Sequence, residues 1–214
     1  QVPQVSKYDK TTVEAGKAFA KSQLQREVGL PVDPSVPLYG FIGRLEEQKG
    51  VDIVLAALKK LPKNAPVQAL ESQVKALENQ YPGMAAGVVK FSNPLAHLIT
   101  AGSDFMLVPS RFEPCGLIQL HAMQYGTVPL VASTGGLVDT ADADSVAQTI
   151  LRAAETYGSP AYTAMRDRCI SQDLSWAQPA KKWEAVLTEL KYGPGPTPEA
   201  TADKASVSTP VQKV

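Results

Sequence analysis

The sequence of 214 residues is poor in the side chains that build disulfide frameworks and metal sites. It has two cysteines, Cys115 and Cys169, and two histidines, His97 and His121. Two cysteines cannot form a disulfide framework, and neither lies at a metal-site spacing from a histidine. We therefore predict that no metal is bound. Both histidines fall in segments of helical periodicity and are interpreted as structural residues.

The sequence also lacks a net charge and a long apolar run. Lys and Arg total 21, as do Asp and Glu, so the formal net charge is zero. This balance argues against nucleic acid or an anionic membrane surface as a main partner. No apolar run is long enough to cross a membrane, and no signal peptide is recognisable. With 44% hydrophobic residues the chain can bury a sizeable core, and its start at Gln1 leads us to expect a piece of a longer protein.

What the sequence does contain is an alternation of short apolar runs with segments of helical periodicity. Strands are predicted at 38–42, 88–91, 105–108 and 128–132. Helices are predicted at 11–28, at 51–62, around Leu70, Val74 and Leu77, from Pro94, after Gly116, around 146–153 and around 183–190. Trp183 in the last of these is interpreted as a residue of core or interdomain packing. The alternation indicates an α/β fold with a Rossmann-like parallel sheet flanked by helices.

The predicted domain occupies residues 10–192. A polar, proline-containing linker precedes it at 1–9. Residues 193–214 hold almost no large apolar side chain, so we predict a disordered tail there.

Two junctions fit a parallel sheet poorly. At Gln68/Ala69 the start of a strand passes at once into a helical pattern, and at Thr140/Ala141 a Gly-Gly turn passes into an acidic helix start. We predict that segments are closed up at both junctions. The alternative is a true deletion.

The stretch from Val108 to Leu117 joins a predicted strand to a predicted helix and carries Glu113. Ligands bind at the carboxyl ends of strands in open parallel sheets. Gly116 allows the backbone to approach a ligand closely, and the N–H groups of a helix start can face an anion. By geometry alone, a solvated or helix-capping glutamate is an equally good interpretation.

Two further loops follow predicted strands. Arg44 and Lys49 are two cations that suit a diphosphate, and Thr134-Gly135-Gly136 offers N–H groups that can cradle an anion. By spacing alone, a solvated charged loop and a plain tight turn remain the more common interpretations.

Three segments, in this order, resemble motifs of the bacterial glycogen synthase and plant starch synthase family. They are Phe41–Gly50, Arg111–Leu117 with Gln119 and Leu120, and Pro129 followed by Ser133–Thr140. The spellings Leu-Glu-Glu-Gln-Lys-Gly and Ser-Thr-Gly-Gly-Leu are most similar to the granule-bound, amylose-making branch. The resemblance implies the C-terminal, nucleotide-sugar-binding half of a GT-B glycosyltransferase.

The resemblance also implies roles for individual residues. Arg44 and Lys49 would hold the diphosphate of the sugar donor, and Glu113 would bind the donor glucose and stabilise positive charge at its anomeric region. These three are the implied catalytic residues. The implied substrate contacts also include Phe91, Cys115, Gly116, Leu117, Thr134, Gly135 and Gly136. Phe91 would end a strand and stack on adenine.

The implied reaction is a retaining transfer of glucose from ADP-glucose to the non-reducing end of an α-1,4-glucan, with ADP as product and no cofactor. It predicts amylose synthesis at the starch granule of a plastid, together with an N-terminal GT-B domain of the same polypeptide. Two alternatives stay open. One is a bacterial-type glycogen synthase domain, and the other is a non-catalytic nucleotide- or glucan-binding module of the same fold.

Overall fold

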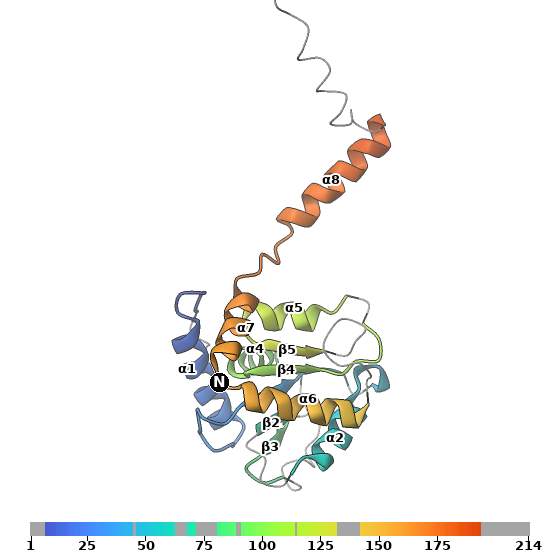
Figure 1. Cartoon of the computed structure of the whole chain (residues 1–214). Coiled ribbons are helices and arrows are strands. Elements are labelled where there is room, and N and C mark those ends of the chain that lie inside the picture. Colours follow the sequence, from blue (N-terminus) through green and yellow to red (C-terminus); the bar gives the residue numbers. More distant parts are fainter. Residues whose placement is uncertain are drawn as a thin grey trace, which may run out of the picture. The chain divides into compact units, whose positions relative to one another are not determined.

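The computed structural model describes most of the chain in two compact units. The described residues are 7–44, 46–62, 81–88, 91–113, 115–131 and 142–193, together with the backbone of 68–71. Unit 1 is Gln1–Gln172 and unit 2 is Asp173–Val214. Each unit is described by itself (Figure 1). The domain predicted at 10–192 comprises most of unit 1 and the helix of unit 2.

The centre of unit 1 is a parallel sheet, whose five described strands have the order β3-β2-β1-β4-β5. The strands are β1 (Leu38–Phe41), β2 (Gln68–Glu71), β3 (Ala85–Gly87), β4 (Phe105–Val108) and β5 (Val128–Val131). The chain builds outward from β1 to β3 and then returns to the other side of β1 to form β4 and β5. The strand order therefore reverses between β1 and β4, and such a switch point is where ligands bind in this kind of sheet.

Helices cover both faces of this sheet (Figure 1). In the described part of unit 1 they are α1 (Val13–Glu27), η1 (Glu47–Lys49), α2 (Val51–Lys60), α4 (Asn93–Gly102), α5 (Leu117–Gln124), α6 (Ala143–Thr156) and α7 (Pro160–Ile170). Helices α2 and α6 pack on one face, and α1, α4 and α5 supply core residues to the other. This arrangement confirms the predicted fold class.

Strands β1 and β4 are buried on both faces of the sheet. This explains why their sequences are runs of mainly apolar residues. In β4, Phe105 and Leu107 join the core under α2 and α6, whereas Met106 and Val108 join the core under α1 and α4. Successive side chains of a strand point to opposite faces, so one short run fills two cores. Tyr39 of β1 stacks on Phe105 with ring centroids 5.2 Å apart.

Local signals place several helix starts where the sequence predicts them. Ser92 accepts a hydrogen bond from the N–H of Leu95, and Pro94 lies in the first turn of α4. Asp142 caps α6 by accepting from the N–H groups of Asp144 and Ser145. These side chains satisfy N–H groups that have no partner within the helix.

Two of the sequence predictions in the middle of the chain are wrong. The helix expected to begin at Ala69 is a strand there, because β2 pairs in parallel with β1 on one side and β3 on the other. The strand expected at 88–91 lies earlier, at Ala85–Gly87, and Phe91 is outside it. Alanine and glycine have low strand propensity, so β3 gives little local signal, and sheet pairing decides its place.

The predicted junctions and tail are described only in part. Gln68 and Ala69 are consecutive residues of β2, paired with Leu38 and Tyr39. Thr140/Ala141 lies outside the described residues, as do the helix positions Val74 and Leu77 and the tail beyond Gly193.

Helix α7 was not predicted from the sequence. Ser159 accepts from the N–H of Tyr162, and Pro160 opens the helix. Tyr162 is its one buried residue. A helix with so little buried surface has a weak apolar periodicity, which is the signal that sequence analysis uses.

The helix of unit 2, α8 (Ala177–Tyr192), confirms the predicted helical stripe. Trp183, Leu187 and Leu190 share that stripe, but no second helix or strand is described within unit 2 to cover them. The packing role predicted for Trp183 is therefore not met within this unit. Among the described helices, none has the length and hydropathy needed to span a membrane.

Candidate functional site

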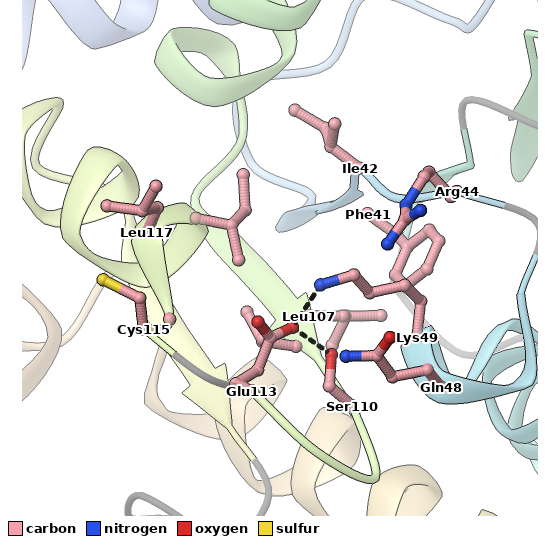
Figure 2. A pocket seen from close by; sticks show the side chains of 13 residues that line it. Phe41, Ile42, Arg44, Gln48, Lys49, Leu107, Ser110, Glu113, Cys115 and Leu117 are labelled. Carbon is pink, nitrogen blue, oxygen red and sulfur yellow. Dashed lines mark hydrogen bonds and ion pairs between the residues drawn. The ribbon is translucent and has the colours of Figure 1, made fainter.

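A pocket of about 260 Å³ lies at the carboxyl ends of β1 and β4, where the strand order reverses (Figure 2). Its lining residues are Phe41, Ile42, Arg44, Gln48, Lys49, Leu107, Val108, Ser110, Glu113, Cys115, Gly116, Leu117 and Ile118. One side comes from β1 and its following loop, and the other comes from β4, its loop and the start of α5. The pocket thus combines apolar walls with a few polar side chains, as ligand sites commonly do.

Two loops build the pocket: the first, residues 42–50, follows β1, and the second, residues 109–116, follows β4. The first loop positions Lys49 at the end of the short helix η1. Gly50 follows with φ of +71°, a left-handed conformation that favours glycine. It ends η1 and begins α2, so the chain turns sharply directly after Lys49. A Cβ atom at Gly50 would overlap the carbonyl oxygen of Pro109 in the second loop. The glycine therefore lets the two loops approach each other.

We expect Gly50→Ala to lower the free energy of unfolding by roughly 2–4 kcal/mol, because backbone strain and steric overlap act together. The matched control is Gly158→Ala. Gly158 has φ of +74°, but a Cβ atom there would meet nothing within 4 Å. It should cost only about 1–2 kcal/mol. Urea titration of both variants measures the difference, and equal losses would contradict the close approach of the loops.

Glu113 in the second loop forms an ion pair with Lys49 inside the pocket (Figure 2). Lys49 Nζ lies 2.7 Å from Glu113 Oε1, and Ser110 Oγ donates to the same oxygen at 2.6 Å. The side chains of Lys49 and Glu113 are 21% and 18% exposed. Partial burial raises the pKa of Glu113, but the hydrogen bonds from Lys49 and Ser110 outweigh it, so the pKa lies below its ordinary value. Glu113 is therefore ionised at neutral pH.

Both donors converge on one carboxylate oxygen. Within the described residues, no donor reaches Oε2 of Glu113. Lys49 uses one of its three N–H donors on Glu113, and no other acceptor for it is found in the described residues. The pair thus leaves an acceptor and two donors for a ligand in the pocket.

Arg44 adds a second cation at the rim of the pocket. Its guanidinium lies 2.9 Å from Glu46, and the two side chains are 70% and 45% exposed. An exposed pair of this kind contributes little energy. Arg44 could therefore leave Glu46 and bind an anionic ligand at little cost in free energy.

The start of α5 forms the opposite rim. Gly116 adopts φ of +64° and precedes the helix without a side-chain cap. Cys115, Gly116 and Leu117 all line the pocket. The uncapped N–H groups of the first turn favour a negatively charged ligand group there.

The structure brings together six of the residues predicted from the sequence. They are Arg44, Lys49, Glu113, Cys115, Gly116 and Leu117. Phe91 does not line this pocket, and its side chain is 94% exposed outside any strand. The prediction that Phe91 ends a strand is therefore wrong. Thr134, Gly135 and Gly136 lie outside the described residues.

Sequence reasoning missed Gln48 and Ser110. Ser110 is three residues before Glu113 in the same turn, a spacing at which a hydroxyl can reach a following side chain. Gln48 precedes Lys49 and reaches across to the second loop, where its Nε2 donates to the carbonyl of Phe112 at 2.9 Å. Only the turn spacing of Ser110 could have been noticed in the sequence. The described part of the chain contains no group of three or more His, Cys, Asp or Glu that could hold a metal ion.

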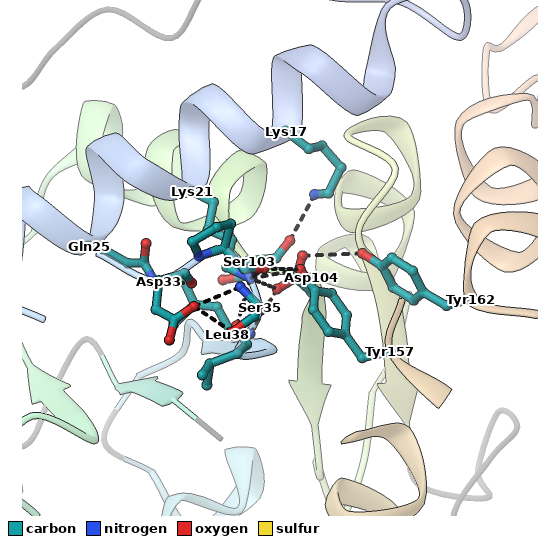
Figure 3. A network of polar contacts seen from close by, with 12 residues as sticks. Lys17, Lys21, Gln25, Asp33, Ser35, Leu38, Ser103, Asp104, Tyr157 and Tyr162 are labelled. Carbon is teal, nitrogen blue, oxygen red and sulfur yellow. Dashed lines mark hydrogen bonds and ion pairs between the residues drawn. The ribbon is translucent and has the colours of Figure 1, made fainter. Parts of the chain in front are cut away.

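A second polar cluster lies at the amino ends of β1 and β4, whereas the pocket lies at their carboxyl ends (Figure 3). Asp104, directly before β4, forms a buried ion pair with Lys21 of α1 at 2.7 Å. The same Oδ2 accepts from the N–H of Leu38, and Oδ1 accepts from the hydroxyl of Tyr162. Lys21 also donates to the hydroxyl of Tyr157 at 2.9 Å. This cluster connects α1 and α7 to the starts of β1 and β4, so we assign it a structural role.

Lys17 of α1 is anchored in the same region. Its Nζ donates to the carbonyls of Ala101 and Ser103 and to the hydroxyl of Thr127, all within 2.9 Å. All three N–H donors of the ammonium are therefore satisfied within the protein. Helix α1 is thus fixed to the sheet by two buried lysines.

A parallel sheet covered by helices on both faces, with a charged pocket at its switch point, is an architecture in which ligands bind at the carboxyl ends of the strands. Residues 25–150, more than half of the chain, match the family described as "Glycosyl transferases group 1". The chain belongs to this family.

Its relatives include plant starch synthases. The chain is 50% identical to granule-bound starch synthase 1, chloroplastic/amyloplastic, from Manihot esculenta, over 95% of this chain and 39% of that protein. It is also 50% identical to the Arabidopsis thaliana protein of the same name, over 86% of this chain and 35% of that protein. The chain thus spans about two-fifths of the length of these relatives. This similarity confirms the resemblance found in the sequence motifs.

The alignment with the Manihot esculenta protein covers 236 residues, which is longer than this chain of 214. The relative therefore contains internal residues that have no counterpart here. Where those residues are missing from this chain stays a prediction.

A solved structure supports the same assignment. The catalytic domain of Starch Synthase IV from Arabidopsis thaliana, bound to ADP and acarbose, matches with a TM-score of 0.74 and 27% identity. The match covers 86% of this chain and 44% of that one. This likeness agrees with the α/β, GT-B half predicted from the sequence.

Proposed function

We propose that this chain is the donor-binding part of a retaining glucosyltransferase. The complete enzyme would transfer glucose from ADP-glucose to the non-reducing end of an α-1,4-glucan and release ADP. The observation that carries the proposal is the Lys49–Glu113 pair, held at 2.7 Å in a pocket at the switch point of the sheet. The starch synthase relatives, one of them solved with ADP, support the choice of substrate.

Four polar side chains of the pocket have a role in this proposal. Lys49 directs its two remaining donors at the diphosphate, and Arg44 leaves Glu46 to bind it as well. Negative charge grows on the departing ADP as the glycosidic bond to phosphate breaks, so fixed cations stabilise the transition state more than the ground state. Glu113, ionised and fixed by Ser110, places its open oxygen toward the sugar, where positive charge develops.

The biological setting is part of the proposal. The relatives are named granule-bound and chloroplastic/amyloplastic, which supports amylose synthesis at the starch granule of a plastid. A bacterial-type glycogen synthase domain would use the same chemistry elsewhere. A non-catalytic binding module is less well supported, because Arg44, Lys49 and Glu113 are present and gathered in one pocket.

We expect the 214-residue chain alone to bind ADP weakly and to elongate no glucan. In a GT-B enzyme a second domain closes over the donor, and an open pocket leaves its charges in water, where they interact weakly. Titration calorimetry with ADP, beside incorporation of radiolabelled glucose from ADP-glucose into a malto-oligosaccharide, measures both. Elongation by this chain alone would show that no second domain is needed. Absence of any ADP binding, even at millimolar ligand, would contradict the donor site.

A further inference from the structure

The two loops that build the pocket are joined by backbone contacts on either side of Lys49. The N–H of Arg111 in the second loop donates to the carbonyl of Gln48 at 2.9 Å. Gln48 in turn donates to the carbonyl of Phe112 at 2.9 Å. On the other side of Lys49, Gly50 lies against the carbonyl of Pro109. Lys49 is therefore held between two residues that both contact the second loop.

The side chain of Arg111 adds a third connection. Its Nη1 and Nη2 donate to Oδ1 and Oδ2 of Asp52, at 2.9 and 2.7 Å, and Nη1 also donates to the carbonyl of Glu47. Asp52 lies in the first turn of α2, directly after the turn that contains Lys49. The hydrogen bonds from Arg111 hold the pKa of Asp52 below its ordinary value, so the pair stays charged.

We propose that Arg111, anchored on Asp52, is a positioning residue that holds Lys49 in register with Glu113. This inference rests on the proposed donor site. Arg111 does not line the pocket, and it acts through the first loop. Glu113 and Lys49 are separated by 64 residues, so their 2.7 Å contact depends on how the two loops are docked.

The geometry suits a positioning role better than a role in stability. The side chains of Arg111 and Asp52 are 37% and 58% exposed, and exposed ion pairs contribute little to folding. The planar guanidinium nevertheless binds both carboxylate oxygens and a carbonyl at once, which fixes orientation. A lysine at this position keeps the charge but cannot bind both carboxylate oxygens and the carbonyl at once. Arg111→Lys should therefore not preserve the positioning of Lys49.

The test compares four variants of the 214-residue chain. They are Arg111→Gln, Asp52→Asn, Lys49→Met and the double variant Arg111→Gln/Lys49→Met. The control is Lys60→Gln, which removes an exposed ion pair of 2.6 Å at the other end of α2. Nuclear magnetic resonance titration with ADP gives the dissociation constants, which can be measured even when binding is weak. The carboxyl carbon resonance of Glu113 gives its pKa, and thermal unfolding gives the midpoint.

We expect Arg111→Gln and Asp52→Asn each to raise the ADP dissociation constant about tenfold, with a midpoint close to that of Lys60→Gln. The pKa of Glu113 should rise, because Lys49 is no longer held against it. In the Lys49→Met background, Arg111→Gln should change ADP affinity by less than about twofold, because it acts through Lys49.

Three results would overturn the inference. They are unchanged ADP affinity in Arg111→Gln, effects of Arg111→Gln and Lys49→Met that multiply in the double variant, and an unchanged pKa of Glu113. If Lys49→Met itself leaves ADP affinity unchanged, the proposed donor site fails and the positioning role fails with it. If Lys49→Met weakens binding and Arg111→Gln does not, only the positioning role fails.

Discussion

Lys49→Ala should lower glucosyl transfer from ADP-glucose on the order of 10²-fold in the complete enzyme that contains this chain. The variant removes the ammonium that contacts Glu113 and that would stabilise the departing diphosphate. Because this stabilisation grows in the transition state, the turnover number should fall more than the affinity for the donor. Steady-state kinetics with a malto-oligosaccharide acceptor measures both quantities.

Glu113→Gln is the matched variant on the other side of the pair. It keeps the shape of the side chain and removes the charge beside the sugar, so it too should lower turnover more than donor affinity. Lys60→Gln, which alters an ion pair far along α2, should leave transfer unchanged. Activity of Lys49→Ala within a few-fold of the parent would refute the role of Lys49. An unchanged turnover number with a raised Michaelis constant in Glu113→Gln would reassign Glu113 to simple binding.

Asp104→Asn should lower the free energy of unfolding by about 3–5 kcal/mol, because it leaves the buried ammonium of Lys21 without its counter-charge. The side chains of Lys21 and Asp104 are only 5% and 7% exposed, and Asp104 also accepts from Leu38 and Tyr162. For a domain of this size, the loss corresponds to a fall of about 10 °C in the unfolding midpoint. Thermal unfolding followed by circular dichroism measures it.

The double variant Asp104→Asn/Lys21→Met provides the control. It removes both charges, so it should lose less stability than the sum of the single variants. Additive losses would mean that the two residues act independently, contrary to the 2.7 Å contact. Ablation of the exposed pair in Lys60→Gln should cost less than about 1 kcal/mol.

Much of the architecture could be read from the sequence, because its signals are local. The runs at β1, β4 and β5 are apolar and bounded by turn residues, and the start of α4 is marked by Ser92 and Pro94. Hydrophobic periodicity and helix capping depend on a few neighbouring residues, so both can be recognised in the sequence without knowledge of the fold. The residues Lys49 and Glu113 each follow a predicted strand, but their roles came from the resemblance to a family, because position and spacing alone left common alternatives open.

The strands β2 and β3 could not be read in this way. The Leu70, Val74 and Leu77 spacing favoured a helix, but Gln68–Glu71 pairs with β1 and β3 and forms a strand. The short strand β3 has the sequence Ala-Ala-Gly, and these residues have low strand propensity, so the sequence alone does not indicate a strand there. Partners far apart in the chain outweigh local preference at such positions.

The sequence by itself determined the class of the fold, the two loops that carry charge and the identity of Lys49 and Glu113. The tertiary structure alone decided that these two side chains meet and that Ser110 shares their contact. It also decided that Asp104 gathers α1, α7, β1 and β4 around one carboxylate. The physical reason is that a local pattern specifies which face of an element is buried. The distance between groups many residues apart depends on strand order and register, which only the packed sheet defines.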